Sequence, residues 1–136
     1  MKPAKATYVL DACALLRLAQ DEPGAERVAD ILSEAQSGSH RVLLHQINLG
    51  EAVYRIAKQF SWSVAERKYG EIALLPIEII PFDDDLFWKA VKLKATYPIS
   101  YADCFAAALA LREKAVLLSS DPEFEIRGDA ASRIKV

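Results

Sequence analysis

The sequence predicts an α/β domain built on a mainly parallel sheet of four to five strands, and three observations support that class. Short apolar segments rich in β-branched and aromatic residues recur along the chain. Longer segments with apolar residues at helical spacing separate them, as expected for parallel strands joined by right-handed crossovers. No repeat, low-complexity tract or linker interrupts the 136 residues, so we expect one domain over residues 1–136.

The first half of the chain is expected to begin with two strands and two helices. Thr7–Leu10 is the first strand, and a short helix follows at about Ala12–Ala19. Asp21–Gly24 ends this helix, because Pro and Gly break helical structure. Apolar residues over Val28–Ala35 then recur at helical spacing, and Arg41–His45 is the second strand.

Two helices are expected between the second and third strands. The apolar stripe of the first consists of Leu49, Val53, Ile56 and Phe60. Ser63 and Glu66 have the spacing of a capping box for the second helix, which is expected to end near Leu75-Pro76.

The remaining elements complete the alternation. Ile77–Phe82 is the third strand, and the acidic run Asp83–Asp85 is expected to cap the next helix. Ser100 is the expected N-cap of the last helix. Ala115–Leu118 is the fourth strand, and Arg133–Val136 is a candidate fifth strand at the sheet edge.

Composition limits the classes of function. The net charge of −2 gives no overall positive field, so a nucleic acid would need local basic patches or bridging metal ions. The N-terminal residues lack an apolar signal core, and no stretch approaches the ~18 apolar residues of a membrane span. We therefore expect a cytoplasmic protein without a membrane segment. Cys13 and Cys104 have no paired metal-ligand spacing and are interpreted as small buried hydrophobic residues.

Four acidic residues stand beside core-forming sequence. Asp11 and Asp121 follow apolar strands, whereas Glu51 and Asp103 lie near the starts of helices. Sites of open α/β sheets form beyond the carboxyl ends of the strands, so all four acids are expected along one edge. Mutual repulsion would destabilise such a pocket unless a cation occupied it.

The chemistry of such a pocket follows from its oxygen ligands. Carboxylates bind hard divalent cations, so Mg²⁺ or Mn²⁺ fits, whereas Zn²⁺ would need a His or Cys cluster that the sequence lacks. Bound divalent ions activate water and stabilise a leaving oxygen, which is the chemistry of phosphodiester hydrolysis.

The acids belong to ordered motifs. In Val9–Leu16, Asp11 follows an apolar strand and precedes a small residue and an apolar pair. A second motif has Asn48 with Glu51 three residues later.

Two further motifs complete the series. Ser100 stands three residues before Asp103 at the entry to an Ala-rich helix, and Ser119–Phe124 follows a strand with the pattern hydroxyl-x-Asp-Pro-x-Phe. The ordered set resembles the PIN-domain ribonucleases, and most closely the VapC-type toxins of bacterial toxin–antitoxin pairs. The resemblance spans nearly the whole chain. Two positions depart from it, since Cys13 replaces the usual Ser or Thr and Ser120 stands where Gly is frequent.

The resemblance implies a PIN-like three-layer domain with endoribonuclease activity that depends on Mg²⁺ or Mn²⁺. The implied catalytic and metal-binding acids are Asp11, Glu51, Asp103 and Asp121. The implied supporting or water-positioning groups are Asn48, Ser100 and Ser119. It also implies an RNA substrate, a cognate antitoxin protein and a homodimer.

Other interpretations stay open from the residues alone. Each acid taken singly fits a cap, a turn or a solvated helix position. A receiver-like signalling domain would need a Lys near Ser119, and a haloacid dehalogenase-type phosphatase would need an Asp at Cys13. A non-catalytic metal- or RNA-binding PIN-like module also remains possible.

Several other polar and aromatic residues are given structural interpretations. His40 and His45 are expected at a loop and a strand end. The helical pair Arg55 and Lys58 is expected on a solvated face, with phosphate contact as the minority interpretation. Lys89 and Lys92 are interpreted in the same way. An aromatic set is expected to be part core and part partner surface: Tyr54, Phe60, Trp62 and Tyr69.

Overall fold

The computed structural model describes residues 5–119 and 133–135 and contains one five-stranded parallel sheet. The strand order is β3-β2-β1-β4-β5. The strands are β1 (Ala6–Leu10), β2 (His40–His45), β3 (Glu78–Ile80), β4 (Val116–Ser119) and β5 (Arg133–Lys135). This confirms the predicted α/β class. The order also differs from the 2-1-3-4-5 order of receiver domains, which argues against the receiver-like alternative.

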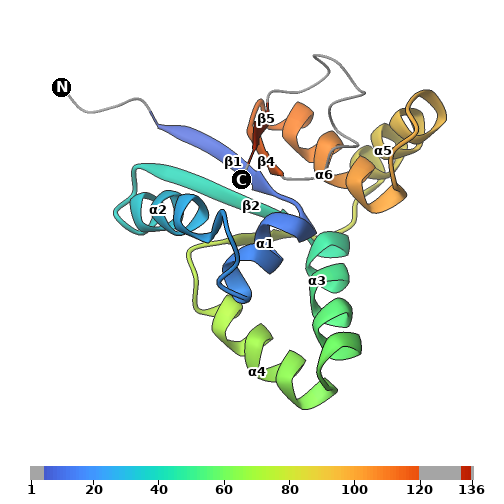
Figure 1. The fold of residues 1–136 in the computed structure, drawn as a ribbon. Coiled ribbons are helices and arrows are strands. Elements are labelled where there is room, and N and C mark those ends of the chain that lie inside the picture. The colour runs from blue at the N-terminus through green and yellow to red at the C-terminus, as the bar shows by residue number, and fades with distance from the viewer. Residues whose placement is uncertain (1–4, 120–132, 136) are drawn as a thin grey trace.

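Within the residues that the structure describes, six helices are arranged on the two sides of the sheet (Figure 1). They are α1 (Ala12–Ala19), α2 (Ala25–Gln36), α3 (Gln46–Gln59), α4 (Trp62–Ala73), α5 (Asp84–Thr96) and α6 (Tyr101–Arg112). Val9, Leu43 and Leu117 pack with α5 and α6, whereas the next residue of each strand packs with the helices α1 to α4. Because strand side chains alternate between faces, the sheet is apolar on both sides. The domain therefore has three layers, with the sheet between two layers of helices.

The parallel register brings the ends of three central strands to one level. Leu10 of β1 pairs with Leu44 of β2 and with Leu118 of β4. The residues that follow these three leucines are Asp11, His45 and Ser119. The carboxyl edge of the sheet therefore carries a polar group on each of three neighbouring strands.

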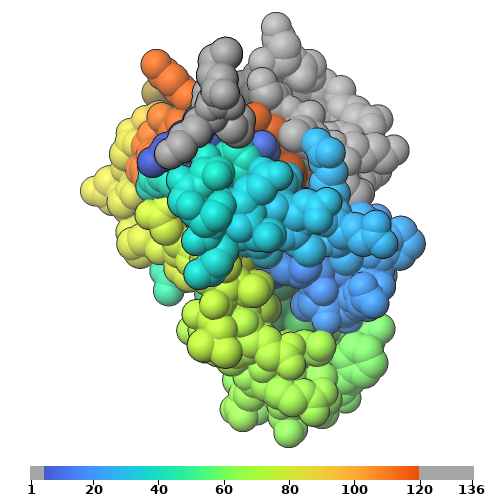
Figure 2. Space-filling view, turned by 90° about the vertical axis from the view of Figure 1, so that its left-hand side faces the viewer, coloured from blue at the N-terminus to red at the C-terminus, as the bar shows by residue number. Residues whose placement is uncertain are grey.

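Helices α3 and α4 form a hairpin that projects away from the sheet (Figures 1 and 2). The expectation that part of its aromatic set is core was wrong, because all four side chains are about half exposed: Tyr54, Phe60, Trp62 and Tyr69. The hairpin is too thin to bury them, since its inner face is filled by small and aliphatic residues such as Ala52, Ile56 and Ala65.

Local differences from the predicted elements have simple causes. Ser61, not Ser63, caps α4, because its extended backbone lets the hydroxyl accept from the Val64 amide at 3.1 Å. Phe60 lies just beyond α3 instead of completing its stripe. The third strand is three residues long because only Glu78–Ile80 finds a partner strand.

No helix in residues 5–119 and 133–135 is long and apolar enough to cross a membrane.

Candidate functional site

The carboxyl edge of the sheet gathers buried polar side chains. Within the described part of the chain, the buried polar or charged residues are Asp11, His45, Asn48, Asp103 and Ser119. Three of them end the central strands, and the other two lie in the first turns of α3 and α6. Burying polar groups costs free energy unless they are hydrogen-bonded, so their concentration at one edge indicates a site and not a random distribution.

Asp11 is fixed between β4 and the start of α1. Its side chain is the N-cap of α1 and accepts the Ala14 amide at 2.8 Å. Its other oxygen accepts a hydrogen bond from the Ser119 hydroxyl at the end of β4. Sequence analysis predicted that both residues would serve one site, and the structure brings their side chains into contact.

Asn48 and Asp103 come together through the packing of α3 against α6. The Asn48 side-chain amide donates to the Ala102 carbonyl at 3.2 Å. Asp103 is the next residue, and its backbone N–H donates to the Ser100 hydroxyl at 3.2 Å, which makes Ser100 the predicted N-cap of α6. The start of α3 is therefore bonded to the first turn of α6, which carries Asp103, at the sheet edge.

The side-chain oxygen of Asn48, Oδ1, is an unsatisfied hydrogen-bond acceptor. It is buried and has no hydrogen-bond partner among the described residues. Because leaving a buried acceptor unsatisfied costs about 1–3 kcal/mol, this atom is expected to accept a bond from a group outside the described protein atoms.

Glu51 lies nearly one turn beyond Asn48 on α3 and is less buried than Asp11 and Asp103. Its carboxylate pairs with Arg55 at 3.4 Å, one turn further along the helix. Its side chain also lines a groove between α1 and α3, together with Cys13. Of the predicted acids in the described chain, Glu51 is the one that faces this groove.

His45 is a member of the edge that sequence analysis treated only as a strand-end residue. Its ring is fully buried between Phe82 and Phe105, with ring centroids 4.8 Å from each, and its Nδ1 accepts the Ile47 amide at 3.0 Å. Burial lowers the pKa of His45 to about 4, against an opposing attraction from Asp83. The imidazole is therefore neutral at pH 7. The sequence signal was its position directly after an apolar strand and before a helix.

The fourth predicted acid, Asp121, lies outside the described residues. In the chain that is described, no three His, Cys, Asp or Glu side chains are grouped so that they could hold a metal ion. The meeting of all four acids in one pocket therefore stays a prediction.

A second acidic cluster lies at the start of α5 and has a structural role. Asp83 is the N-cap of α5 and accepts the Leu86 amide at 2.8 Å. Arg112 pairs with Asp83 at 2.9 Å and with Asp85 at 3.3 Å, and Lys89 also pairs with Asp85. The interpretation of this run as a helix N-terminus is confirmed.

The comparisons with known proteins agree with this geometry. A family model described as PIN domain matches residues 8–129. The chain belongs to the PIN domain family. No curated protein matches the sequence significantly.

Solved VapBC and VapC structures share the fold. One is VapBC2 from Rickettsia felis bound to a DNA fragment from its promoter, with 19% identity and a TM-score of 0.75 over 95% of this chain and 98% of that one. VapBC-1 from nontypeable Haemophilus influenzae is 21% identical, with a TM-score of 0.70 over 95% and 97% of the two chains.

A third structure is similar in fold and carries an activity in its description. VapC20 from Mycobacterium tuberculosis, described as a sarcin-ricin loop cleaving toxin, is 14% identical to this chain. Its TM-score is 0.69 over 89% of this chain and 95% of that one. At these identities the likeness concerns the PIN fold.

Proposed function

We propose that this PIN domain is a Mg²⁺- or Mn²⁺-dependent endoribonuclease and the toxin of a toxin–antitoxin pair. The observation that supports it most is the gathering of buried polar side chains at the carboxyl edge, with Asp11, Asn48 and Asp103 among them. This edge is where open α/β sheets bind ligands. The fold shared with VapC20, which is described as a sarcin-ricin loop cleaving toxin, supports a cleaving activity.

The residues at the edge suit a hard divalent cation. Asp11, Glu51 and Asp103 would hold it, with Asp121 as the fourth predicted ligand. All the donors are oxygen atoms, as Mg²⁺ and Mn²⁺ prefer. The unsatisfied carbonyl oxygen of Asn48 fits a site that is completed by an ion and its water. When bound, the ion supplies Lewis acidity toward a phosphate oxygen and toward the attacking water.

The protein groups contribute orientation. Asp11 is held in one rotamer by the Ser119 hydroxyl and the Ala14 amide, so its carboxylate needs no reorganisation before it acts. The side-chain carbonyl of Asn48 can accept a hydrogen bond from a water and so aim the lone pair of that water at phosphorus. The Asn48 amide meanwhile stays bonded to the Ala102 carbonyl. Ser100 fixes the first turn of α6 and so the position of Asp103.

A cleavage assay tests the activity. With millimolar Mg²⁺, the wild-type chain should cut RNA and leave 5′-phosphate and 3′-hydroxyl ends, because a water attacks phosphorus. Asp11→Asn should lower the rate at least ~100-fold, a loss typical of removing one central catalytic group. The matched control is Asp30→Asn, which makes the same change on the exposed face of α2 and should cut like wild type. A 2′,3′-cyclic phosphate product, or equal rates for both variants, contradicts the proposal.

The proposed partners are a cognate antitoxin and a second copy of this chain. The α3–α4 hairpin offers an apolar groove of ≈ 470 Å³ lined by Leu49, Val53, Tyr54, Trp62 and Tyr69. An amphipathic antitoxin segment could place its apolar face there. The fold shared with the VapBC2 and VapBC-1 structures supports such a partner.

Expression in a bacterial host tests the toxin assignment. The wild type alone should slow growth, and co-expression of the small protein encoded beside it should restore growth and yield a complex that co-purifies. Trp62→Ser should weaken that complex, because it removes a large exposed apolar side chain from the groove. A wild-type chain that is harmless, and whose neighbour does not bind it, contradicts the toxin assignment while leaving nuclease activity open.

A further inference from the structure

A second groove starts at the proposed site and runs between α1 and α3. Its volume is ≈ 680 Å³, and it is lined by Cys13, Leu16, Arg17, Gln20, Glu22, Glu51, Tyr54, Arg55, Lys58 and Gln59. Cys13 is two residues beyond Asp11, and Glu51 is one of the proposed ligands, so the inner end of the groove lies at the catalytic edge. From Glu51 to Gln59 the α3 wall extends ~12 Å, at 1.5 Å per residue.

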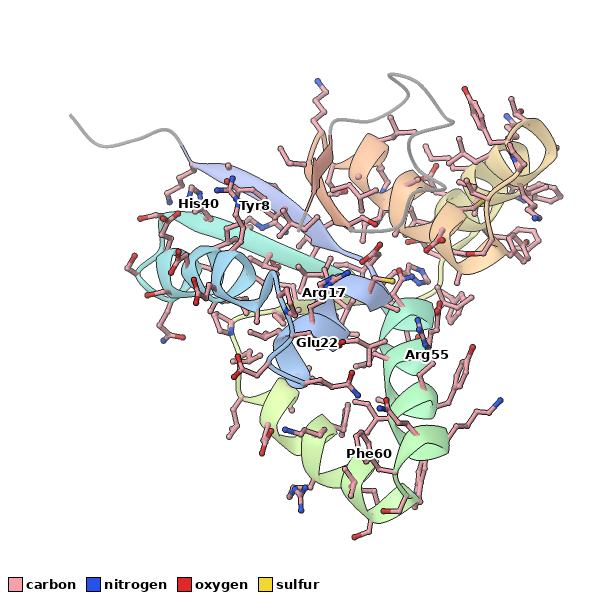
Figure 3. All side chains as sticks on the ribbon, in the orientation of Figure 1. Tyr8, Arg17, Glu22, His40, Arg55 and Phe60 are labelled. Carbon is pink, nitrogen blue, oxygen red and sulfur yellow. The ribbon has the colours of Figure 1, made fainter. Side chains whose placement is uncertain are left out.

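Three cations line this groove. Arg17 projects from α1 and Arg55 from α3, the two helices that form the walls (Figure 3). Lys58 lies three residues beyond Arg55 and forms no ion pair within the part of the chain that the structure describes. Against these stand Glu22 and Glu51, and Glu51 would be engaged by the ion in the proposed enzyme. The lining is therefore net positive on a chain whose overall charge is −2.

The two arginines are held in place by protein groups. Arg17 donates to the Pro23 carbonyl at 2.8 Å, which fixes its guanidinium near the end of α1. Arg55 contacts Glu51 at 3.4 Å and also the Cys13 side chain, so it spans the groove from α3 to α1. At the outer end, the Gln20 amide donates to the Gln59 carbonyl at 3.0 Å and ties the two walls together.

The chemistry of the lining favours a phosphate chain. Guanidinium groups bind phosphate oxygens in a bidentate fork, and a lysine ammonium adds a point charge. The half-exposed Tyr54 and the two glutamine amides offer stacking and hydrogen bonds to sugars or bases. The α3–α4 groove, by contrast, has an apolar lining.

We propose that the α1–α3 groove binds the backbone of the RNA strand beside the scissile bond, with Arg17, Arg55 and Lys58 contacting successive phosphates. This inference rests on the proposed ribonuclease function and names the part of the chain that carries substrate to the acids. Arg55 stands one turn from Glu51 on the same helix face, so a phosphate that it holds lies close to the catalytic edge.

Binding measured without catalysis tests this groove. A fluorescent single-stranded RNA is titrated with the full chain in a chelator, so that no cleavage occurs. Arg17→Gln, Arg55→Gln and Lys58→Gln should each weaken binding ~3–10-fold at low salt and reduce the slope of log K against log salt by about one. The matched control is Lys92→Gln on the exposed side of α5, which should bind within ~2-fold of wild type.

The outcomes separate the groove from the activity. If the three groove variants bind like wild type, or if Lys92→Gln loses as much as they do, the groove assignment is overturned. If polyglutamate of similar charge competes as well as RNA, the occupant is an acidic peptide, and the assignment also fails. Groove-dependent RNA binding without cleavage in Mg²⁺ supports the groove and contradicts the nuclease function. Cleavage that is unchanged in all three variants supports the nuclease and overturns the groove.

Discussion

Two acidic regions of this molecule are built in opposite ways. At the start of α5, Asp83 and Asp85 lie at the surface and are neutralised by Arg112, Lys89 and the helix N-terminus. At the carboxyl edge of the sheet, Asp11 and Asp103 are buried. Asp11 there is oriented by a hydroxyl and a backbone amide, both neutral donors.

The difference separates a stabilising cluster from a functional one. The α5 cluster contains its own cations, so it can persist without any ligand, and its exposed ion pairs contribute little individually. The pKa of Asp83 is lowered first by its bond from the Leu86 amide and then by Arg112. Burying carboxylates at the sheet edge costs stability, and a bound divalent ion would offset that cost.

Acid should destabilise the two regions in different pH windows. His45 is buried and neutral at the sheet edge, with its pKa lowered to about 4, whereas its unfolded-state pKa is ~6.5. The unfolded chain therefore binds an extra proton as the pH falls from ~6.5 to ~4, and the His45 contribution to stability is lost over that range. Between pH 7 and pH 4.5 this amounts to about 2 kcal/mol.

Urea denaturation of two variants checks this contrast. His45→Asn keeps an acceptor at the N-cap of α3. Between pH 7 and pH 4.5, the free energy of unfolding of this variant should fall by about 2 kcal/mol less than that of wild type. Asp83→Asn should follow wild type over that range within about 0.5 kcal/mol, because Asp83, with its lowered pKa, stays charged there and loses its contribution only below ~3.8. If His45→Asn and wild type lose the same free energy of unfolding in acid, the buried neutral His45 is not a source of the acid sensitivity.

Much of the fold was predictable because periodicity and caps are local signals. Ala12–Ala19 is the first helix as predicted, and Asp83 and Ser100 cap the helices that they were expected to cap. The α4 cap was misassigned because Ser61 and Ser63 both precede a helical pattern, and only the backbone conformation at Ser61 decides between them. Part of the aromatic set was expected to be exposed, but the exposure of all four side chains was not predictable, since it depends on how far the hairpin projects.

The site was predictable in part, because topology brings strand ends together. Strand topology placed Asp11 at the carboxyl edge, and the family resemblance added Ser119 as a supporting group. The structure joins the two residues by a hydrogen bond. The contact between the Asn48 amide and the Ala102 carbonyl depends on tertiary packing of α3 on α6. The burial of His45 between two aromatic rings likewise depends on residues more than thirty positions away.

Thermal unfolding with and without Mg²⁺ tests the central claim most directly, namely that the buried edge and not the exposed cluster holds a divalent ion. At a metal concentration tenfold above Kd, binding to the native state stabilises it by about 1.4 kcal/mol, or a Tm rise of ~3–5 °C for a chain of this size. We expect this rise at pH 7 in wild type and in Asp83→Asn, and its loss in Asp11→Asn and Asp103→Asn. A wild-type Tm indifferent to Mg²⁺, or a rise abolished by Asp83→Asn and kept by Asp11→Asn, would contradict the account.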